Sequence, residues 1–247
     1  MKCILLVAGY ATRLYPLTEN MPKSLLKVAD KTILEHILEK VKGIENIDEI
    51  ILVSNDRFYE QFEKWIRNYS FNKKLTVLND GTTTNDNRLG AIADLQFAID
   101  KLSIADDLLV LAGDNLFDFN LQDFVRYFET VQADCITVNE IQEVDILRRT
   151  GVVEVDERGI AIGFEEKPQE PKSNLAVPPF YIYQKETLSL IKKYLEEGNN
   201  PDAPGNFIPW LLKRKKVYTF KFEGMRYDIG THESYREVNE LFKLRKL

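Results

Sequence analysis

The feature that most constrains the fold of this 247-residue chain is an apolar run near its start and the loop that follows it. Cys3 to Ala8 form a continuous apolar run, short enough for a β-strand covered on both faces. Gly9 ends the run, small side chains surround it, and the cations Arg13 and Lys23 come next. Small side chains let backbone amides approach an anion, and cations neutralise the charge that the amides leave. The stretch therefore predicts a strand that opens into a polyphosphate-binding loop.

The loop matches neither of the two best-known phosphate-binding patterns, GxxxxGK[ST] and GxGxxG. A tight turn after a buried strand is also an ordinary feature of α/β proteins that bind no phosphate. The combination of Gly9, Thr12, Arg13, Pro22 and Lys23 favours the phosphate-binding interpretation over the purely structural one.

Strand-like apolar runs alternate with helical spacings over the first 140 residues or so. Strands are expected at 49–54, 75–78, 108–112 and 135–139, and helices at 31–42, 56–69, 88–102 and 121–132. This alternation predicts an α/β, Rossmann-like, doubly wound and mostly parallel sheet with helices on both faces. Ligands of such sheets bind at the carboxyl ends of strands. If the first strand lies between those at 49–54 and 108–112, the Gly9 loop and Asp114 border one crevice.

The pattern changes after about residue 145. We expect a hairpin at 151–155 and 159–164, strands at 175–183 and 217–222, helices at 186–197, 207–214 and 232–244, and a loop at 199–206. No composition break marks a linker. Residues 1–247 are therefore expected to form one domain, with a core over about 1–145 and a smaller β-containing substrate lobe over about 146–247 that returns to the core.

Composition excludes several classes of function. The net charge is −6 without a long block of like charge, which argues against nucleic-acid binding. No apolar stretch approaches 18 residues, and the first apolar run is too short for a signal peptide, so we expect no membrane association. Cys3 and Cys135 lie in apolar runs and are predicted to be reduced core thiols. We expect a cytoplasmic protein.

Several separated motifs carry a resemblance to a known family. The stretch AGYATRLYPLTENMPKSLLKV resembles the signature of the sugar-phosphate nucleotidyltransferases, (A/G)-G-x-(G/A)-T-R-L-x-P-x-T followed by P-K. Gly113-Asp114-Asn115, Glu166-Lys167-Pro168 and Tyr227-Asp228-Ile229-Gly230-Thr231 resemble later motifs in the family's order. The resemblance covers nearly the whole chain. It implies an enzyme that joins an NTP and a sugar-1-phosphate, giving an NDP-sugar and pyrophosphate.

The resemblance also implies roles for individual residues. In-line attack on the α-phosphorus needs positioning and charge neutralisation more than a strong base. Arg13 would contact the leaving β- and γ-phosphates, and Lys23 would bridge the α-phosphate and the attacking phosphate. The nucleotide-binding loop would be formed by Ala8, Gly9, Tyr10, Ala11 and Thr12.

Two carboxylates and a second group of residues complete the implied site. Asp114 and Asp228 would hold Mg²⁺ together with phosphate oxygens, as Mg²⁺ prefers. Glu166 and Lys167 would bind a sugar hydroxyl and the acceptor phosphate, and Tyr181 would line the acceptor pocket.

The chain departs from the family pattern at two places. Thymidylyl- and uridylyltransferases typically place a glutamine upstream of a glycine that opens the next helix. Gly90 fits that glycine, but Asn85 stands at the glutamine's position with Asp86 beside it. Before the aromatic pair at 180–181 the family usually has glycine, whereas this chain has Pro179, which lacks an N–H. Because of these two departures, the sequence does not identify the nucleobase or the acceptor.

Two other functions remain open. One is a cytidylyltransferase whose acceptor is a non-sugar phosphate such as a phospho-alcohol, which the two departures favour. The other is a catalytically silent subunit that senses nucleotide sugars, whose signature would be loss of Arg13, Lys23, Asp114 or Asp228; all four are present. Many relatives are oligomers, so a homo-oligomer is possible by analogy.

Overall fold

The computed structural model describes residues 1–245. Its elements fall into two compact units, neither of which is one continuous stretch of chain. The unit that contains the Gly9 loop, which we call the Gly9 unit, comprises Cys3–Arg88, Ala112–Asn120 and the chain from Gly224 onward. The second, which we call the hairpin unit, comprises Met1–Lys2, Leu89–Leu111 and Leu121–Glu223.

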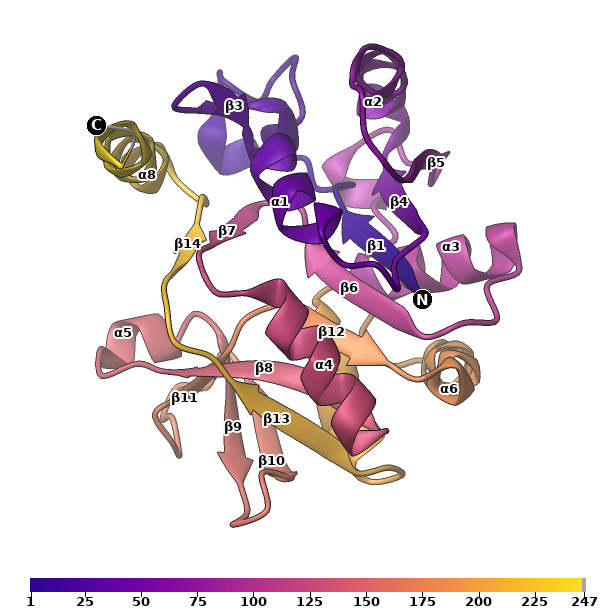
Figure 1. Ribbon diagram of the computed structural model, residues 1–247, viewed down its shortest axis with the longest axis vertical. Helices are drawn as coiled ribbons and strands as arrows, with labels where there is room; N and C mark the ends of the chain where they lie inside the picture. The colour runs from indigo at the N-terminus through magenta and orange to yellow at the C-terminus, as the bar shows by residue number, and fades with distance from the viewer. Residues whose placement is uncertain (246–247) are drawn as a thin grey trace. The chain divides into compact units, whose positions relative to one another are not determined.

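The Gly9 unit is built on parallel strands. β4 (Glu49–Ser54) is buried at all six of its residues and pairs in parallel with β5 (Lys74–Asn79). A strand covered on both faces needs an unbroken apolar sequence, which is why β4 shows no alternation. α2 (Asp56–Asn68) connects the two strands and packs against both, as Figure 1 shows.

The end of β1 (Lys2–Leu6) lies between two other strand ends. The amide of Val7 donates to the carbonyl of Val53 at the end of β4 (3.0 Å). The amide of Gly113 donates to the carbonyl of Leu6 (3.0 Å). The Gly9 loop and the segment that carries Asp114 therefore begin side by side.

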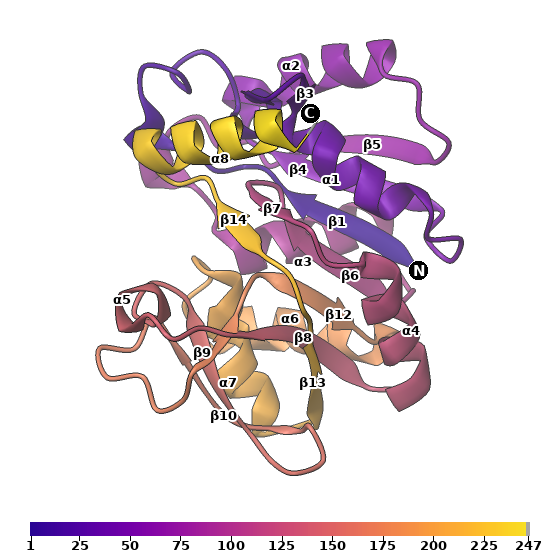
Figure 2. The same cartoon turned by 60° about the vertical axis from the view of Figure 1, so that its left-hand side comes forward.

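Shorter elements complete the Gly9 unit. They are β2 (Lys27–Val28), β3 (Lys31–Thr32), α1 (Ile33–Lys42), β7 (Asn115–Phe117), β14 (Arg226–Asp228), α8 (His232–Leu244) and 3₁₀ turns at Thr12–Leu14, Lys23–Leu25 and Asn85–Asn87. Figure 2 shows α8 beside the β2–β3 hairpin, which it contacts.

The hairpin unit is a mixed sheet with helices against it. Its strands run in the order β10-β9-β11-β8-β12-β6. Each strand in this order pairs antiparallel with its neighbours. β13 lies outside this order and pairs with β8 in parallel. Its elements are α3 (Ala91–Leu102), β6 (Leu108–Ala112), α4 (Leu121–Val131), β8 (Asp134–Glu140), α5 (Val144–Leu147), β9 (Gly151–Val155), β10 (Ala161–Glu166), β11 (Leu175–Val177), β12 (Phe180–Tyr183), α6 (Lys185–Glu196), a 3₁₀ turn at Pro204–Asn206, α7 (Phe207–Leu212) and β13 (Val217–Lys221). The predicted α/β class is confirmed, and antiparallel pairing appears in the half where the sequence pattern changes.

Among the element boundaries that differ from the prediction, three differences have a clear local cause. The strand predicted at 175–183 is two strands, because Pro178 and Pro179 interrupt it and the amide of Phe180 turns back to the carbonyl of Pro178 (2.7 Å). α1 begins two residues later than predicted, since Thr32 caps it. α3 begins at residue 91, because residues 84–87 form their own capped turn.

The two cysteines lie in the core. Cys3 and Cys135 are both free and 0% exposed, as predicted, and burial raises the pKa of each thiol. Within residues 1–245, no helix combines the length and the apolar character that crossing a membrane would require.

Candidate active site

The loop after β1 is held in place by side chains from outside it. Asn55 Nδ2 donates to the carbonyl of Ala8 (2.8 Å), and the Thr18 hydroxyl donates to the carbonyl of Ala11 (2.8 Å). Ala11 itself is left-handed, with φ 47° and ψ 41°, a conformation that a residue with a Cβ keeps only where its surroundings impose it. A Cβ at Gly9 would meet no atom within 4 Å, so the fixed backbone faces open space there.

Within the described part of the chain, residues 1–245, Arg13 is a cation without a partner. It lies in the 3₁₀ turn after Ala11, directly behind the exposed Thr12, and is exposed itself. Among residues 1–245 its guanidinium makes no hydrogen bond or ion pair. A Cβ at Gly230 would lie 3.5 Å from Arg13 Nη2 and 3.8 Å from each carboxylate oxygen of Asp228, so these two side chains border Gly230. An exposed, unpaired arginine beside an open loop is suited to an anion.

Lys23 and Asp114 form an ion pair in the same unit. Lys23 is only 8% exposed, and its Nζ lies 2.9 Å from Asp114 Oδ2. Asn115 Nδ2 donates to the other oxygen of Asp114 (2.6 Å). The Ser24 hydroxyl donates to the carbonyl of Gly113 (2.7 Å), which ties the Lys23 turn to the chain just before Asp114. The 91 residues that separate Lys23 and Asp114 are thus bridged twice.

The pKa of Asp114 reflects these contacts. Desolvation acts to raise it, but the charge and hydrogen bond of Lys23, the Asn115 amide and the charge of Arg226 together hold the pKa below its ordinary value. The Asp114 side chain is still 42% exposed. It is therefore an ionised carboxylate, open to a cation from solvent.

A short pair of strands places Asp228 near Asp114. β14 runs antiparallel to β7 with Asp228 opposite Asn115, so Asp228 lies across the ladder from the neighbour of Asp114. Arg226 Nη2 lies 3.4 Å from Asp228 Oδ2, and the Asp228 side chain is 52% exposed. The structure thus brings Arg13, Lys23, Asp114 and Asp228 into one unit.

The donor set of this cluster fits a hard cation. Its two carboxylates offer oxygen only, which Mg²⁺ prefers over sulfur and imidazole. Residues 1–245 contain no group of three or more His, Cys, Asp or Glu side chains placed to hold a metal, so protein atoms alone build no cage. Mg²⁺ commonly keeps water and substrate phosphate among its ligands, so two carboxylates suffice.

The residues predicted to read the base lie in an exposed turn. Asn85 and Asp86 begin the 3₁₀ turn at 85–87 and are both exposed. Asn87 Oδ1 accepts from the amides of Thr83 (3.2 Å) and Thr84 (3.0 Å), which closes the turn and leaves the Asn85 and Asp86 side chains outside those bonds. Their predicted role stays a prediction.

Tyr10 connects the phosphate loop to this segment, which the sequence did not indicate. Its side chain is 2% exposed, and its hydroxyl donates to Thr82 Oγ1 (3.3 Å). Thr82 in turn donates through both its hydroxyl and its amide to Asp80 Oδ1 (2.7 Å each). Tyr10 thus contributes backbone to the loop and a buried side chain to its support.

Gly90 belongs to the hairpin unit and opens α3, as predicted. Its φ of +94° requires glycine, and a Cβ there would lie 2.7 Å from the carbonyl oxygen of Pro201. The first amides of the helix are already bonded, Ala91 to the carbonyl of Asp202 (3.1 Å) and Ile92 to that of Pro201 (2.9 Å). The loop at 199–206 therefore takes the place that an anion could occupy at this helix start.

The predicted acceptor residues lie in the hairpin unit. Glu166 ends β10, and Lys167 follows it in a left-handed conformation (φ 51°), with Nζ 4.0 Å from Glu166 Oε1 and 60% of its side chain exposed. The amide of Lys167 donates to the carbonyl of Thr150 (3.1 Å), which fixes the turn. Tyr181 is 2% exposed and stacks on Tyr183, so its predicted role in sugar binding stays a prediction.

Two glycines surround the Glu166 carboxylate. A Cβ at Gly205 would lie 2.0 Å from Glu166 Oε2, and a Cβ at Gly151 would lie 3.2 Å from the same atom. Gly205 precedes α7 in the 3₁₀ turn at 204–206. The sequence marks it only as part of a Pro-Gly-Asn turn, so its contact with Glu166 was not predictable.

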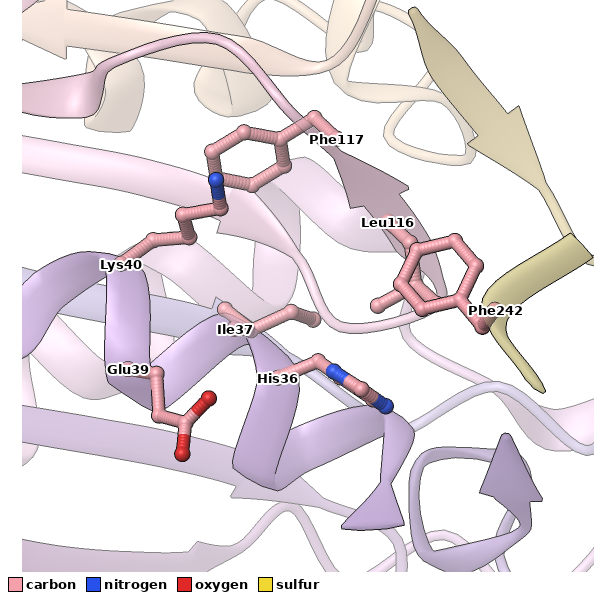
Figure 3. A pocket seen from close by; sticks show the side chains of 7 residues that line it. All are labelled: His36, Ile37, Glu39, Lys40, Leu116, Phe117 and Phe242. Carbon is pink, nitrogen blue, oxygen red and sulfur yellow. The ribbon is translucent and has the colours of Figure 1, made fainter. Parts of the chain in front are cut away.

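A cavity of about 260 Å³ in the Gly9 unit contains none of the predicted site residues (Figure 3). It is lined by His36, Ile37, Glu39, Lys40, Leu116, Phe117 and Phe242. Burial lowers the pKa of Lys40, whose amine lies beside the Phe117 ring. His36 Nε2 lies 2.9 Å from the carbonyl of Val28.

Comparison with known families agrees with this geometry. The family model described as nucleotidyl transferase matches residues 2–243. The chain belongs to this family. Within the family, it is 31% identical over 241 residues to the bifunctional protein GlmU of Methanocaldococcus jannaschii, a match that covers 97% of the chain and 54% of that relative. It is 27% identical to a putative mannose-1-phosphate guanyltransferase of Sulfolobus acidocaldarius, over 99% of the chain and 64% of the relative.

A solved structure of the family has the same fold. A putative glucose-1-phosphate thymidylyltransferase from Bacillus anthracis, in complex with a sucrose, superposes with a TM-score of 0.81 at 25% identity, covering 98% of this chain and 95% of that one. The chain spans about half the length of the first curated relatives that it matches. The family is thereby established.

Proposed function

We propose that this protein transfers a nucleotidyl group from an NTP to a sugar-1-phosphate and releases pyrophosphate. The observation that supports this best is the cluster in the Gly9 unit, where an unpaired Arg13 borders Asp228 and a buried Lys23 pairs with Asp114 beside an open, fixed loop. The family supports nucleotidyl transfer, and the names of two relatives indicate sugar-1-phosphates as the acceptor class.

The reaction requires this cluster to neutralise phosphate charge and to position the reacting groups. An oxygen of the acceptor phosphate forms a bond to the α-phosphorus while the bond to the bridging oxygen of pyrophosphate breaks. Arg13 would neutralise the leaving β- and γ-phosphates, since a guanidinium binds phosphate oxygens in a fixed fork. Lys23 would neutralise the α-phosphate and the attacking phosphate as charge develops there. The amides of the loop at 8–12 would hold the triphosphate in line.

Asp114 and Asp228 would hold Mg²⁺. When bound, the ion would neutralise phosphate charge and polarise the α-phosphate. Asp114 is suited to this role because the low pKa of its carboxyl keeps it ionised at neutral pH. In the hairpin unit, Lys167 would bind the acceptor phosphate and Glu166 would accept a hydrogen bond from a sugar hydroxyl.

Pyrophosphate release tests the proposal. The protein is incubated with Mg²⁺, each of ATP, GTP, CTP, UTP and dTTP, and a panel of sugar-1-phosphates. We expect turnover with at least one pair, and a loss of at least about a hundredfold in Asp114→Ala or Lys23→Ala with folding retained. Asp123→Ala and Lys221→Ala, which remove residues of exposed ion pairs, serve as matched controls and should keep normal rates.

The same assay, with phospho-alcohols added to the panel of acceptors, separates the alternatives. A cytidylyltransferase is favoured by Asn85 at the position of the family's glutamine and by the interruption of the sheet at Pro178 and Pro179. Turnover only with CTP and a phospho-alcohol would identify it. A silent sensing subunit would give thermal stabilisation by a nucleotide or nucleotide sugar without any pyrophosphate, since ligand binding raises stability by mass action.

A further inference from the structure

One side of α8 carries three polar side chains that contact the backbone on either side of Lys23. The contacts, each 2.7 Å long, are His232 Nε2 to the carbonyl of Tyr15, the Tyr235 hydroxyl to the carbonyl of Lys27, and Asn239 Oδ1 to the amide of Ala29. Spacings of three and then four residues place these side chains on one face of an α-helix. α8, seen beside the β2–β3 hairpin in Figure 2, therefore holds the chain from residue 15 to residue 29 at both ends.

The contact of His232 is the one closest to Arg13 along the chain. Tyr15 follows the 3₁₀ turn that carries Arg13, and its amide donates to the carbonyl of Thr12 (3.2 Å). Because the Arg13 guanidinium has no partner among residues 1–245, its position depends on the backbone of this turn. The turn is fixed on one side by Thr18, which bonds the carbonyl of Ala11, and on the other by His232.

The same short stretch of chain carries the second carboxylate. Asp228 ends β14, Gly230 approaches Arg13, and Thr231 caps α8 just before His232. The stretch from Asp228 to His232 thus meets the Arg13 turn at two points, at Gly230 and at His232. A shift at His232 would change the separation of the arginine and the carboxylate.

The donor in this contact can be assigned from its chemistry. A carbonyl oxygen only accepts, so Nε2 of His232 carries the hydrogen. Both the neutral ring in this tautomer and the protonated ring keep that N–H. The contact therefore does not depend on ring charge, and a glutamine amide could replace the donor.

We propose that His232 is a positioning residue for the triphosphate. It acts through the carbonyl of Tyr15, which sets where the Arg13 turn lies relative to Asp228, and it does not touch the substrate. This inference rests on the proposed nucleotidyl transfer. It predicts that loss of the N–H donor at residue 232 weakens binding of the nucleotide and does not change binding of the acceptor.

A matched pair of variants tests the donor. His232→Gln keeps an amide donor and His232→Met has a similar length without one. We expect His232→Met to raise KM for the NTP and to weaken binding of Mg²⁺–tripolyphosphate about tenfold, with His232→Gln within about threefold of the wild type. KM for the acceptor should change less than twofold in both. His36→Ala removes a similar histidine–carbonyl contact, to Val28, and should leave nucleotide KM unchanged.

The outcomes separate the two proposals. If the wild-type protein releases no pyrophosphate with any NTP and any acceptor, the proposed function is overturned. Active wild type with equal nucleotide KM in the Gln and Met variants would overturn only the positioning role. An equal loss in His36→Ala, or an equal rise in acceptor KM, would also overturn it, because the effect would then be a general loosening of α8. Thermal unfolding of each variant verifies that the fold is retained.

Discussion

Replacing Gly205 by alanine should impair the acceptor side of the reaction without unfolding the protein. Gly205 has no left-handed φ, so alanine meets no backbone strain there. Its new methyl group would lie 2.0 Å from Glu166 Oε2, whereas real Cβ atoms essentially never approach another heavy atom closer than 3.0 Å. The carboxylate must therefore move by at least about 1 Å. The atom that yields is the end of a flexible side chain, so the cost in folding free energy should stay below about 1 kcal/mol.

The catalytic cost should be larger than the structural one. Glu166 is proposed to accept a hydrogen bond from the acceptor, and a misplacement of about 1 Å can cost on the order of a hundredfold in rate. We therefore expect kcat/KM for the acceptor to fall between about tenfold and a hundredfold, since a hydrogen bond to a charged group contributes about 1.5–3 kcal/mol. KM for the NTP should not change, because Glu166 is assigned to the acceptor alone.

Initial-rate measurements of pyrophosphate release, with each substrate varied in turn, provide the assay. Gly43→Ala is the matched control, because a Cβ there meets nothing within 4 Å and its φ is −83°. In a Glu166→Ala background, Gly205→Ala should no longer lower kcat/KM for the acceptor, since the new methyl group would have no carboxylate to displace. An unchanged acceptor kcat/KM in folded Gly205→Ala, or an undiminished effect without the carboxylate, would refute the reasoning.

Two other predictions concern charge pairs. Lys215 Nζ lies 2.9 Å from Oδ2 of Asp134, which is fully buried. Lys215→Met leaves this carboxylate without its counter-ion, so it should lower the free energy of unfolding in urea titrations by about 3 kcal/mol. Lys216 is exposed, and Lys216→Met should change the free energy of unfolding by less than about 0.5 kcal/mol. In the wild type the stabilisation from Asp114 is present above the ordinary carboxyl pKa of 3.8 and is lost as pH falls through the lower folded value. Lys23→Met removes the main lowering influence, so the carboxyl ¹³C titration of Asp114 should move to higher pH, and a midpoint that stays or falls would contradict the assignment.

The parts of the site that the sequence predicted are those set by local chain geometry. A buried strand followed by small residues fixes where the Gly9 loop must lie, and Asp114 follows another buried strand in the same way. Parallel strands end at one edge, so the meeting of these two segments follows from topology. Lys23 was indicated as a phosphate-binding cation by its place after the small-residue loop, but not as the partner of Asp114. Asp228 was identified only by resemblance to a family, since nothing in its own spacing indicates a partner.

The parts that escaped prediction depend on tertiary contacts between irregular segments. β7 and β14 have three residues each, too few for any periodicity to show, although their pairing is what places Asp228 opposite Asn115. The contact of Gly205 with Glu166 depends on where a turn falls against a strand end. The side chain of Tyr10 enters the core from a loop whose small neighbours indicate exposed backbone. In each case the sequence sets the local conformation and the packing sets the partner.

The charges of the Gly9 unit give a reason why a divalent ion and a triphosphate should bind together. Arg13, Lys23 and Arg226 face Asp114 and Asp228, which leaves one net positive charge for a ligand that carries about four negative ones. Asp114 is paired with Lys23, and Asp228 with Arg226, so in the absence of an ion the carboxylates neutralise two of the cations that would bind the phosphates of the proposed substrate. A divalent ion on the carboxylates would add two positive charges and release Lys23 and Arg226 toward the phosphates. Binding of the triphosphate and binding of the ion should therefore favour each other. The carboxylates would exchange their cationic partners for the ion, and the cations would exchange the carboxylates for phosphates.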